Sequence, residues 1–400
     1  MDGLLTLEEA QARLLALANP LPVERVPVEE ALERFLAEAL IARRAQPAAD
    51  LSAMDGYAMR AADLPGPWQV VGESAAGHPF VGTVGAGTAV RISTGAHLPA
   101  GADMVLLQED ALREGTALCL RGEPPVPADR HVRHCGADFS DGATLLAAGT
   151  RLGPAQLALA IGAGHNRLAV RRRPQVAILD CGDELAVDPA ACLPHQIPAS
   201  NGVMLAALAA SLPCAIDRLG PVADRLDAVV ATLDQASDAD VVVTSGGVSV
   251  GDHDLLRPAL ETWGAELDFW KVGIKPGKPL LVARRGAQVI IGLPGNPVSS
   301  YVTAYLFVLP LLRALLGSAT PLPRAIAVPT AEALPAGGNR REFLRAYWGG
   351  HSVSARINQD SGALATMAAS NALIDRPIGA PAVPAGTMVP VYLLDGGASA

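Results

Sequence analysis

The sequence predicts a multidomain α/β protein organised around a doubly wound, mostly parallel sheet. A chain of 400 residues is too long for one hydrophobic core, which indicates several domains. From about residue 174 to residue 322, short β-branched segments alternate with apolar segments of helical length, the pattern of parallel strands joined by helices. On both sides of this region, Gly, Pro and short apolar runs indicate smaller β-rich parts.

Composition narrows the possible functions and locations. Half of the residues are apolar, so the chain has ample material for packed cores. A net charge of -9 disfavours binding to nucleic acid or to an anionic membrane, and we expect neither as a partner. The five cysteines form no CxxC pair, which argues against a disulfide framework and a zinc site. The acidic segment MDGLLTLEEAQARLL lacks the basic start of a signal peptide, so we expect a cytoplasmic protein.

The first 50 residues predict two helices. The sequence TLEE, which begins at Thr6, has the pattern of a capping box, and the helix should run to about Ala18. Pro27 suits the first position of a second helix with the sequence VEEALERFLAEALIARR. Residues 48 to 149 then alternate between short apolar runs and turns, which predicts a small β-rich domain.

The central region predicts strands and helices in alternation. The segments QVAILDC, ADVVVTS and AQVIIGL suit strands, and NGVMLAALAASL, DRLDAVVATLDQA and DLLRPALETWG suit helices. The uncharged run from residue 290 to 312 is long enough for a membrane span, but its first half contains two prolines. A strand, a turn and a buried helix capped by Ser299 or Ser300 therefore explain it better. Another β-rich part should follow from about Pro321.

Two turns that follow predicted strands are candidates for binding sites. Ser245, Gly246 and Gly247 open a glycine-rich turn whose backbone N–H groups suit an anion, although an ordinary strand-to-helix turn has the same composition. The turn LPGNP, which contains Pro294 and Pro297, follows another strand. Since ligands of doubly wound sheets bind beyond the carboxyl ends of the strands, both turns should line one cleft together with the loop KPGKP, residues 275–279.

The stretch FWKVGIKPGKP contains every lysine of the chain: Lys271, Lys275 and Lys278. The chain has 31 basic residues, so the other 28 are arginines. A compact ammonium group suits the oxygens of phosphate or of another oxyanion, whereas arginine favours bidentate partners. A loop that is merely solvated could equally have carried arginine, so this stretch favours an oxyanion site over a solvated loop.

Several acidic residues follow turn-like motifs. Asp55 lies in SAMDGYA, Asp138 in CGADFSDG, Glu184 in CGDEL and Asp254 in VGDHDLL. Each alone is more often a turn former or, for Asp254, an N-cap. Together they have the chemistry for Mg²⁺, which usually takes one or two carboxylates together with substrate phosphates.

Six motifs taken together resemble the molybdenum insertases, or molybdopterin molybdotransferases, which include bacterial MoeA proteins and the C-terminal domain of gephyrin. The motifs are SAMDGYA, RISTGAHLPAGAD, GDEL, TSGGVSVGDHD, FWKVGIKPGKP and LPGNPVSS. The resemblance covers essentially the whole chain. It implies that adenylylated molybdopterin and molybdate are substrates, and that Mg²⁺-dependent hydrolysis releases molybdenum cofactor and AMP.

The resemblance also implies roles for individual residues. Catalytic roles fall to Asp55, Asp138, Glu184, Asp254, Lys271 and Lys275. Substrate binding falls to Thr94, Ser245, Gly246, Gly247, Ser249, Lys278, Pro294, Pro297, Ser299 and Arg345, with Ser361 a further candidate. Mg²⁺ binding falls to Asp55, Glu184, Asp224 and Asp254. The chain departs from the family motif STGDEL, because it reads DCGDEL, with Cys181 at the threonine position.

The family fold implies four domains and an elongated homodimer. Residues 1–22 with 174–322 would form the doubly wound molybdopterin-binding domain, and residues 23–47 with 142–173 a linking domain. Residues 48–141 would form an inserted β-rich domain and residues 323–400 a β-barrel. The active site would lie between two subunits, with Asp55 and Asp138 of one facing the lysines of the other.

Two other functions are compatible with parts of the sequence. An adenylyltransferase of the same pathway carries a similar Ser-Gly-Gly turn, but a single-domain enzyme of that kind has no need of KPGKP. A scaffold role, as in gephyrin, would call for a linker or partner domain, which the sequence does not suggest. The adenylyltransferase and molybdoenzymes that accept the cofactor are possible partners.

Overall fold

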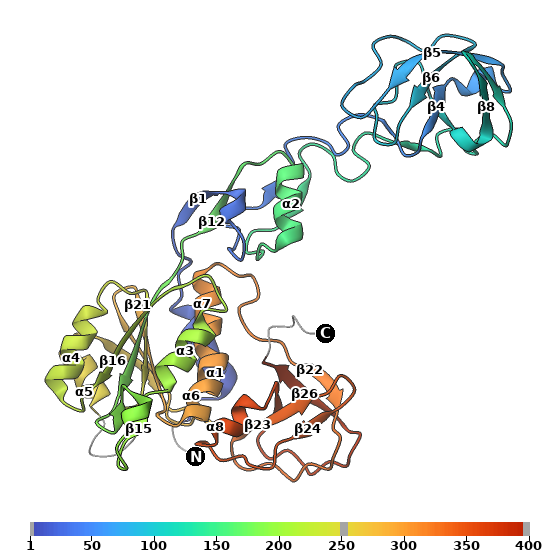
Figure 1. The fold of residues 1–400 in the computed structure, drawn as a ribbon. Helices are drawn as coiled ribbons and strands as arrows, with labels where there is room; N and C mark the ends of the chain where they lie inside the picture. The colour runs from blue at the N-terminus through green and yellow to red at the C-terminus, as the bar shows by residue number, and fades with distance from the viewer. Residues whose placement is uncertain (1–3, 249–254, 395–400) are drawn as a thin grey trace.

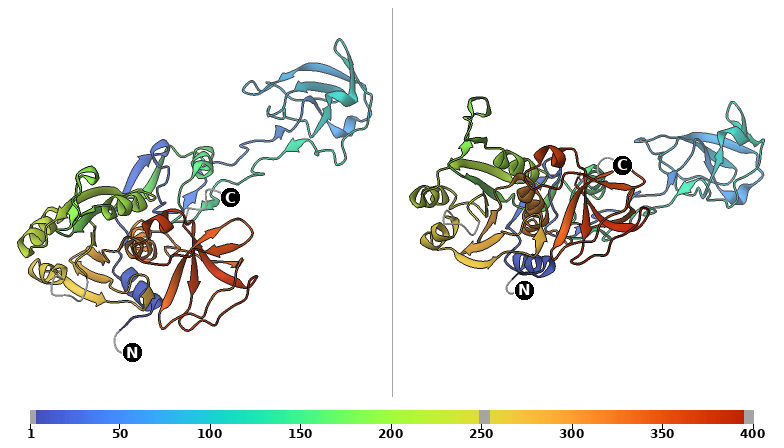
Figure 2. Two further views of the ribbon diagram at one scale, coloured as in Figure 1. Left: turned by 60° about the horizontal axis from the view of Figure 1, so that its bottom comes forward. Right: turned by 90° about the horizontal axis from the view of Figure 1, so that it is seen from below.

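The computed structural model describes residues 4–248 and 255–394. The predicted residues Ser249 and Asp254 therefore lie outside the described residues. Figure 1 shows a doubly wound domain beside a C-terminal sheet, a small connecting domain above them, and an inserted β domain at the far end. The inserted domain stands apart from the rest in both further views (Figure 2).

The central sheet confirms the predicted doubly wound, mostly parallel fold. Its strand order is β16 (Ala215–Val222), β13 (Gln175–Cys181), β17 (Val241–Ser245), β21 (Gln288–Leu293), β20 (Leu281–Arg285) and β18 (Glu266–Trp270). The first four strands are parallel, and β20 and β18 run antiparallel to their neighbours. The carboxyl ends of β13, β17 and β21 therefore meet at one edge of the sheet.

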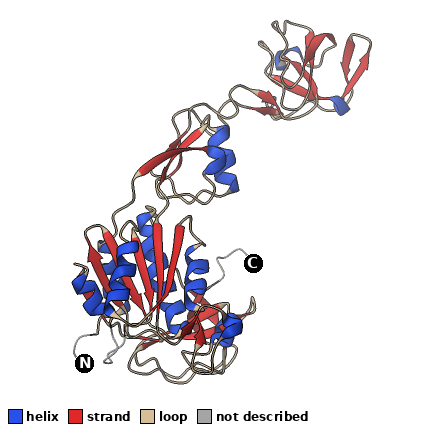
Figure 3. Cartoon of the chain, turned by 60° about the vertical axis from the view of Figure 1, so that its left-hand side comes forward, coloured by secondary structure: helices blue, strands red, loops and turns tan. Residues whose placement is uncertain are grey.

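Both faces of this sheet are covered by helices, as Figure 3 shows. On one face, Val176 and Ile178 pack in a core that includes side chains of α1, α3, α6 and α7. On the other, Ala177 and Leu179 pack with side chains of α4 and α5. The strands are apolar at successive positions because both faces are buried. The bounds are α1 (Leu7–Ala16), α3 (Asn201–Ala209), α4 (Leu226–Gln235), α5 (Leu256–Thr262), α6 (Pro297–Thr303) and α7 (Leu309–Leu315).

The uncharged run contains the end of strand β21, a turn and a core helix, as predicted. Residues 304–308 form one π-helical turn that joins α6 to α7, and the whole helix, Pro297–Leu315, is long and apolar enough to cross a membrane. In the most apolar 18-residue stretch of this helix, 83% is buried inside the protein, as in the core helix of a globular fold. The predicted cap is wrong. The helix begins at Pro297 with Asn296 as N-cap, so Ser299 and Ser300 lie within its first turn.

The first predicted helix is confirmed and the second is wrong. The Thr6 hydroxyl accepts from the Glu9 backbone, and the Glu9 carboxylate accepts from the Thr6 backbone. Strand β1, Val23–Pro27, comes just before the predicted second helix and pairs with β12 (Arg167–Arg171). Only a 3-10 turn, Val28–Glu30, follows before the chain turns at Glu33, where φ is 66°.

The connecting domain and the inserted domain hold the remaining strands of the first half. Besides β1 and β12, the connecting domain contains α2 (Pro154–Gly162) and the pair β2 (Leu40–Ile41) and β11 (Thr144–Leu146). The pair β3 (Leu51–Ser52) and β10 (Val132–Arg133) leads into the inserted domain. The inserted sheet has the order β7 (Met104–Leu107), β4 (Gly56–Met59), β6 (Thr88–Ile92), β5 (Trp68–Ser74), β9 (Ala117–Leu120) and β8 (Ala111–Glu114).

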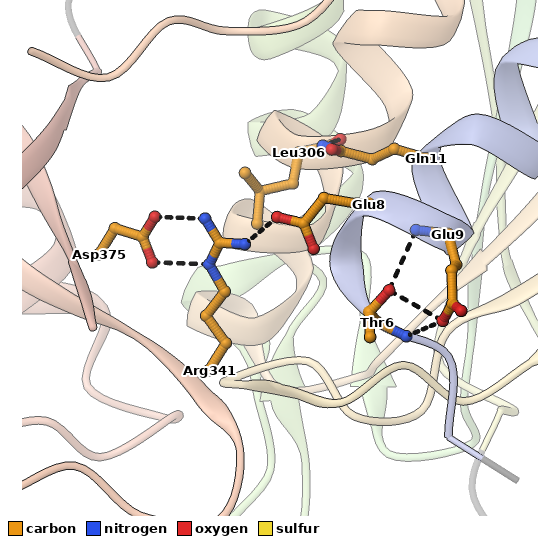
Figure 4. A network of polar contacts seen from close by, with 7 residues as sticks. All are labelled: Thr6, Glu8, Glu9, Gln11, Leu306, Arg341 and Asp375. Atoms are coloured by element: carbon orange, nitrogen blue, oxygen red, sulfur yellow. Dashed lines mark hydrogen bonds and ion pairs between the residues drawn. The ribbon is translucent and has the colours of Figure 1, made fainter. Parts of the chain in front are cut away.

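The C-terminal sheet packs beside α1 and α6. Its order is β19 (Ile274–Lys275), β23 (Arg341–Trp348), β25 (Ala372–Arg376), β26 (Met388–Leu393) and β22 (Ile326–Pro329), with β24 (Val353–Ala355) on β23. Short strands β14 (Leu185–Ala186) and β15 (Ile197–Pro198) and helix α8 (Leu364–Ala368) complete the elements. Figure 4 shows the polar link to α1, in which Arg341 contacts both Asp375 and Glu8. Because β19 belongs to the lysine stretch, this sheet is joined directly to KPGKP.

Candidate functional site

Two neighbouring cavities lie at the carboxyl edge of the central sheet. The larger has a volume of about 960 Å³ and includes residues from the ends of β13 and β17, the start of α3 and the LPGNP turn. The smaller, of about 340 Å³, lies between the KPGKP loop and the C-terminal sheet. Pro279 lines both cavities. The turns that the sequence singled out are thus brought to one place.

The glycine-rich turn after β17 forms one wall of the larger cavity. Ser245, Gly246 and Gly247 all line it, and Gly246 has a φ of 91°. A Cβ atom at Gly246 would lie 2.5 Å from the carbonyl oxygen of Cys181, so only glycine lets the two strand ends approach this closely. The Asn201 side chain donates to the Ser245 hydroxyl at 2.8 Å and to the Gly295 carbonyl at 2.7 Å. Asn201, which the sequence analysis missed, thereby ties α3 to both turns.

Two of the predicted metal-binding acids line the larger cavity. Glu184 follows β13 and Asp224 follows β16. The loops that carry them are joined, since the Asp224 backbone N–H donates to the Asp183 carboxylate at 3.0 Å. Among the described residues, no group of three His, Cys, Asp or Glu side chains is placed to hold a metal ion. Two carboxylates on one cavity nevertheless fit Mg²⁺, which takes its remaining oxygens from water and substrate phosphates.

The other predicted acids lie elsewhere in the chain. Asp55 belongs to the inserted domain, where its carboxylate accepts from the Thr94 backbone at 2.7 Å and from the Thr94 hydroxyl at 3.0 Å. These bonds, the backbone one first, hold the pKa of Asp55 below its ordinary value. Asp138 lies on the segment between the inserted and connecting domains, where its N–H donates to the Gln46 carbonyl. Within one chain, neither Asp55 nor Asp138 lines either cavity.

Two of the three lysines line the smaller cavity. Lys275 and Lys278 border it, and the Lys275 ammonium lies 2.8 Å from the Glu342 carboxylate on β23. The Lys271 ammonium instead lies 3.9 Å from the centre of the Trp270 ring, a cation–π contact. Gly277 holds the loop against α6, because a Cβ atom there would lie 2.4 Å from the Thr303 methyl carbon. The structure therefore assigns two exposed lysines, not three, to this cavity.

A buried arginine forms the other side of the smaller cavity. Arg345 is only 1% exposed, and its guanidinium donates to the Asp360 carbonyl at 2.9 Å and to the Asn358 carbonyl at 3.2 Å. Burial lowers the pKa of Arg345, against the opposing effect of Asp360. Its Nε–H is buried without an acceptor in the part of the chain that the structure describes. A cation with an unused donor beside two lysines fits an oxyanion.

The LPGNP turn separates the two cavities. Pro294 and Pro297 line the larger one, and Ser299, at 5% exposure, lines the smaller one. The Asn296 amide donates to the Ser361 hydroxyl at 2.8 Å, and the Ser361 carbonyl accepts from the Val298 N–H. The C-terminal segment around Ser361 is thus held at the boundary, and Ser361 itself lines the smaller cavity.

Cys181 is a buried residue in the wall of the larger cavity, and we predict that its thiol is inert. Burial, followed by the charges of Asp224 and Asp180, raises the pKa of Cys181 to about 12. Cys119 and Cys135 are exposed. Because alkylation requires the thiolate, iodoacetamide at pH 8 should modify Cys181 at least about 100-fold more slowly than Cys135. Peptide mass spectrometry measures both rates, and similar rates in the folded protein would contradict the prediction.

Comparisons with known proteins agree with this arrangement along the whole chain. Residues 5–164 match the family model "MoeA N-terminal region (domain I and II)", residues 177–314 a "Probable molybdopterin binding domain", and residues 327–394 the "MoeA C-terminal region (domain IV)". A molybdopterin molybdenumtransferase of Haemophilus influenzae is 37% identical over 318 residues, which cover 78% of each chain. One of Bacillus subtilis is 32% identical over 402 residues, covering 97% of this chain and 94% of the relative.

Solved structures show the same architecture. A molybdopterin biosynthesis MoeA protein from Pyrococcus horikoshii superimposes with a TM-score of 0.84 at 29% identity. The superposition covers 98% of this chain and 100% of the other. A second structure described in the same way, from Pyrococcus horikoshii OT3, has a TM-score of 0.85 at 27% identity with the same coverage.

Proposed function

The chain belongs to the MoeA family of molybdopterin molybdenumtransferases, and from this premise we propose that its two neighbouring cavities together insert molybdenum into molybdopterin. One observation carries the proposal. The larger cavity, lined by glycines at the edge of the central sheet, lies next to the smaller cavity, which is lined by the lysines of KPGKP. The larger cavity suits an extended organic substrate. The smaller suits a compact oxyanion, and here that oxyanion is molybdate.

The cationic cavity explains how molybdate is held. Lys275 and Lys278 supply ammonium groups, and Arg345 supplies the buried Nε–H that lacks an acceptor among the residues described. Glu342 pairs with Lys275 and fixes its ammonium at the rim. Since molybdate carries two negative charges, these donors neutralise it beside the substrate in the larger cavity.

We propose that the substrate in the larger cavity is adenylylated molybdopterin. Water attacks one phosphorus of the phosphoanhydride, the bond from that phosphorus to the bridging oxygen breaks, and the products are AMP, molybdopterin with its own phosphate, and two protons. The two thiol groups of molybdopterin then bind molybdenum, and their protons leave with one oxygen of molybdate as water. Glu184 and Asp224 are placed to hold Mg²⁺, which would neutralise the phosphate charges. The backbone N–H of Gly247 offers a further donor to phosphate oxygens, whereas that of Gly246 already donates to the Leu293 carbonyl at 3.1 Å.

We further propose that a second copy of the chain completes the site. The inserted domain, with Asp55 already oriented by Thr94, lies far from the cavities of its own chain (Figure 1). A homodimer that brings Asp55 and Asp138 of one copy to the lysines of the other would place both acids in an active site. A monomer with full activity would contradict this arrangement. The five cysteines are free thiols, which suits a cytoplasmic enzyme.

The test of the proposed function is AMP release from adenylylated molybdopterin in the presence of Mg²⁺. The wild-type protein should release AMP when molybdate is added and yield molybdenum cofactor in equal amount. Removal of Mg²⁺ by a chelator should stop the release. No AMP release under these conditions would contradict the proposal. Formation of pyrophosphate from ATP and molybdopterin would instead identify an adenylyltransferase.

A further inference from the structure

An unusual buried carboxyl group lies at the end of β13. Asp180 is the next-to-last residue of this strand and pairs in register with Ser245 of β17. It lines the larger cavity, yet its exposure is only 5%. The metal-binding and oxyanion-binding roles proposed above do not explain why a carboxyl group is buried here. The sequence motifs did not single out Asp180 either.

Only one of the two oxygens of Asp180 has a partner among the residues that the structure describes. Its Oδ2 accepts a hydrogen bond from the backbone N–H of Gly202, at the start of α3, with a distance of 2.9 Å. A Cβ atom at position 202 would lie 2.1 Å from this oxygen, so the contact requires glycine there. The Oδ1 atom is buried and has no hydrogen-bond partner within residues 4–248 and 255–394.

The hydrogen bond to the start of helix α3 does not by itself explain why a carboxyl group stands at position 180. A single N–H bond at a helix start needs one side-chain oxygen, which serine or asparagine supplies without a charge. Leaving a second carboxylate oxygen buried and unpaired carries a desolvation cost. Burial raises the pKa of Asp180, and the Gly202 N–H and the charge of Arg218 offset only part of that rise. Within the described residues, the pocket therefore offers no N–H donor to Oδ1, and a ligand can supply one.

We propose that Asp180 recognises the pterin ring of the substrate by accepting hydrogen bonds from the N–H donors of its 2-amino-4-oxopyrimidine edge. The inference rests on the proposed function, because it takes molybdopterin as the occupant of the larger cavity. The 2-amino group and N3–H of this edge lie side by side and point in one direction. A carboxylate matches such a pair of donors and binds it with charge-assisted hydrogen bonds.

Charge separates the two ends of the substrate. A carboxylate at Asp180 repels phosphate and molybdate, so the anionic groups must lie away from it. Lys275 and Lys278 draw anions towards the smaller cavity, and Pro279 lies where the two cavities meet. The pterin edge at Asp180 and the anions at the far side thus define one orientation of the substrate.

The test compares two ligands that differ only at the recognised edge. The phosphate ester of 6-hydroxymethylpterin carries the 2-amino group, whereas the corresponding lumazine has an oxygen in its place. Both are fluorescent, so their dissociation constants follow from titration of the wild-type protein. We expect the pterin to bind about 10- to 100-fold more tightly than the lumazine. Asp180→Asn, which keeps an oxygen for Gly202 but offers an amide to the ring, should abolish this preference.

A matched control separates recognition from loss of charge or fold. Asp103 also accepts one backbone N–H, from Ala61, but lies in the inserted domain. Asp103→Asn should leave the ratio of the two dissociation constants unchanged. Equal binding of the two ligands by the wild type, or an unchanged ratio in a folded Asp180→Asn protein, would overturn the proposal.

The outcome does not depend on turnover. A protein that releases AMP normally but does not prefer the pterin would contradict this inference and leave the proposed function standing. A protein that prefers the pterin but never releases AMP would support this inference and contradict the proposed function. Asp180→Asn should not weaken the binding of AMP alone, because the recognised edge belongs to the pterin. If Asp180→Asn weakens AMP binding to the same extent as pterin binding, Asp180 instead contacts the adenine, and the inference is wrong.

Discussion

Replacement of Lys275 by alanine is expected to lower molybdate-dependent AMP release about 100-fold, the usual effect of removing one charged donor from a transferring oxyanion. The structure supplies a second reason for a large effect. The Lys275 ammonium lies 2.8 Å from Glu342, whose side chain is only 15% exposed. Without the lysine, this carboxylate is left unpaired on the wall of the smaller cavity. The variant thus loses a cation and uncovers an anion where molybdate should bind.

The two contributions can be separated by a double-mutant cycle. Glu342→Gln in the Lys275→Ala background should recover part of the lost activity, because it removes the uncovered charge. Lys271→Ala is the matched control, since its ammonium contacts the Trp270 ring and not the cavity. Initial rates at several molybdate concentrations measure the effect. An unchanged dependence on molybdate in Lys275→Ala would place the oxyanion elsewhere.

The Lys271 control also tests a point on which sequence and structure give different answers. The sequence grouped three lysines because they share one short stretch, and spacing alone does not show which way each side chain points. Lys271 has a left-handed backbone, with a φ of 73°, and its ammonium lies over the Trp270 ring and not at the smaller cavity. Lys275 and Lys278 flank Pro276 and Gly277, which pack inward and leave both ammonium groups at the surface.

Much of the fold could be predicted because its signals are local. In the central domain, strands β13, β17 and β21 are mostly apolar in sequence, and a glycine or proline follows each of them directly. The second helix was predicted wrongly because its residues have helical propensity, but Leu36 pairs with Val170 and Ile41 of β2 pairs with Thr144 of β11, each more than 100 residues later in the chain. Long-range pairing of this kind overrides local propensity and leaves no mark in the segment itself.

The candidate site was predictable to the extent that it is made of motifs. Ser245, Pro294 and Glu184 lie in recognisable turns, and the structure brings them to one cavity. Asp180 and Asn201 were missed because nothing in sequence tells a buried strand-end carboxylate from an exposed one. Only the packing of α3 against β13 shows that Gly202 leaves room for the carboxylate.

The second large effect concerns stability: Arg341→Ala should destabilise the contact between the C-terminal sheet and α1 by about 3 kcal/mol. The Arg341 guanidinium binds both oxygens of Asp375, at 2.6 and 2.7 Å, and also contacts Glu8 of α1 (Figure 4). Asp375 is only 3% exposed, so truncation of the arginine leaves a buried charge without a partner. Exposed pairs have far smaller effects because water replaces the lost partner.

Hydrogen exchange measures this effect locally, which a multidomain protein requires because global unfolding is not two-state. Amides of β23 and β25 should exchange about 100-fold faster in Arg341→Ala, as expected for a loss of about 3 kcal/mol. Asp375→Asn in the same background should restore part of the protection by removing the uncompensated charge. Arg284→Ala, which breaks an exposed pair with Glu266, should cost less than about 1 kcal/mol. Equal effects of Arg341→Ala and Arg284→Ala would show that burial of Asp375 does not determine the strength of this link.

Strand β23 also carries Glu342 and Arg345, which line the smaller cavity. Loosening of this strand in Arg341→Ala should therefore weaken molybdate binding as well. The stability of the C-terminal sheet is in this way connected to the geometry of the cationic cavity.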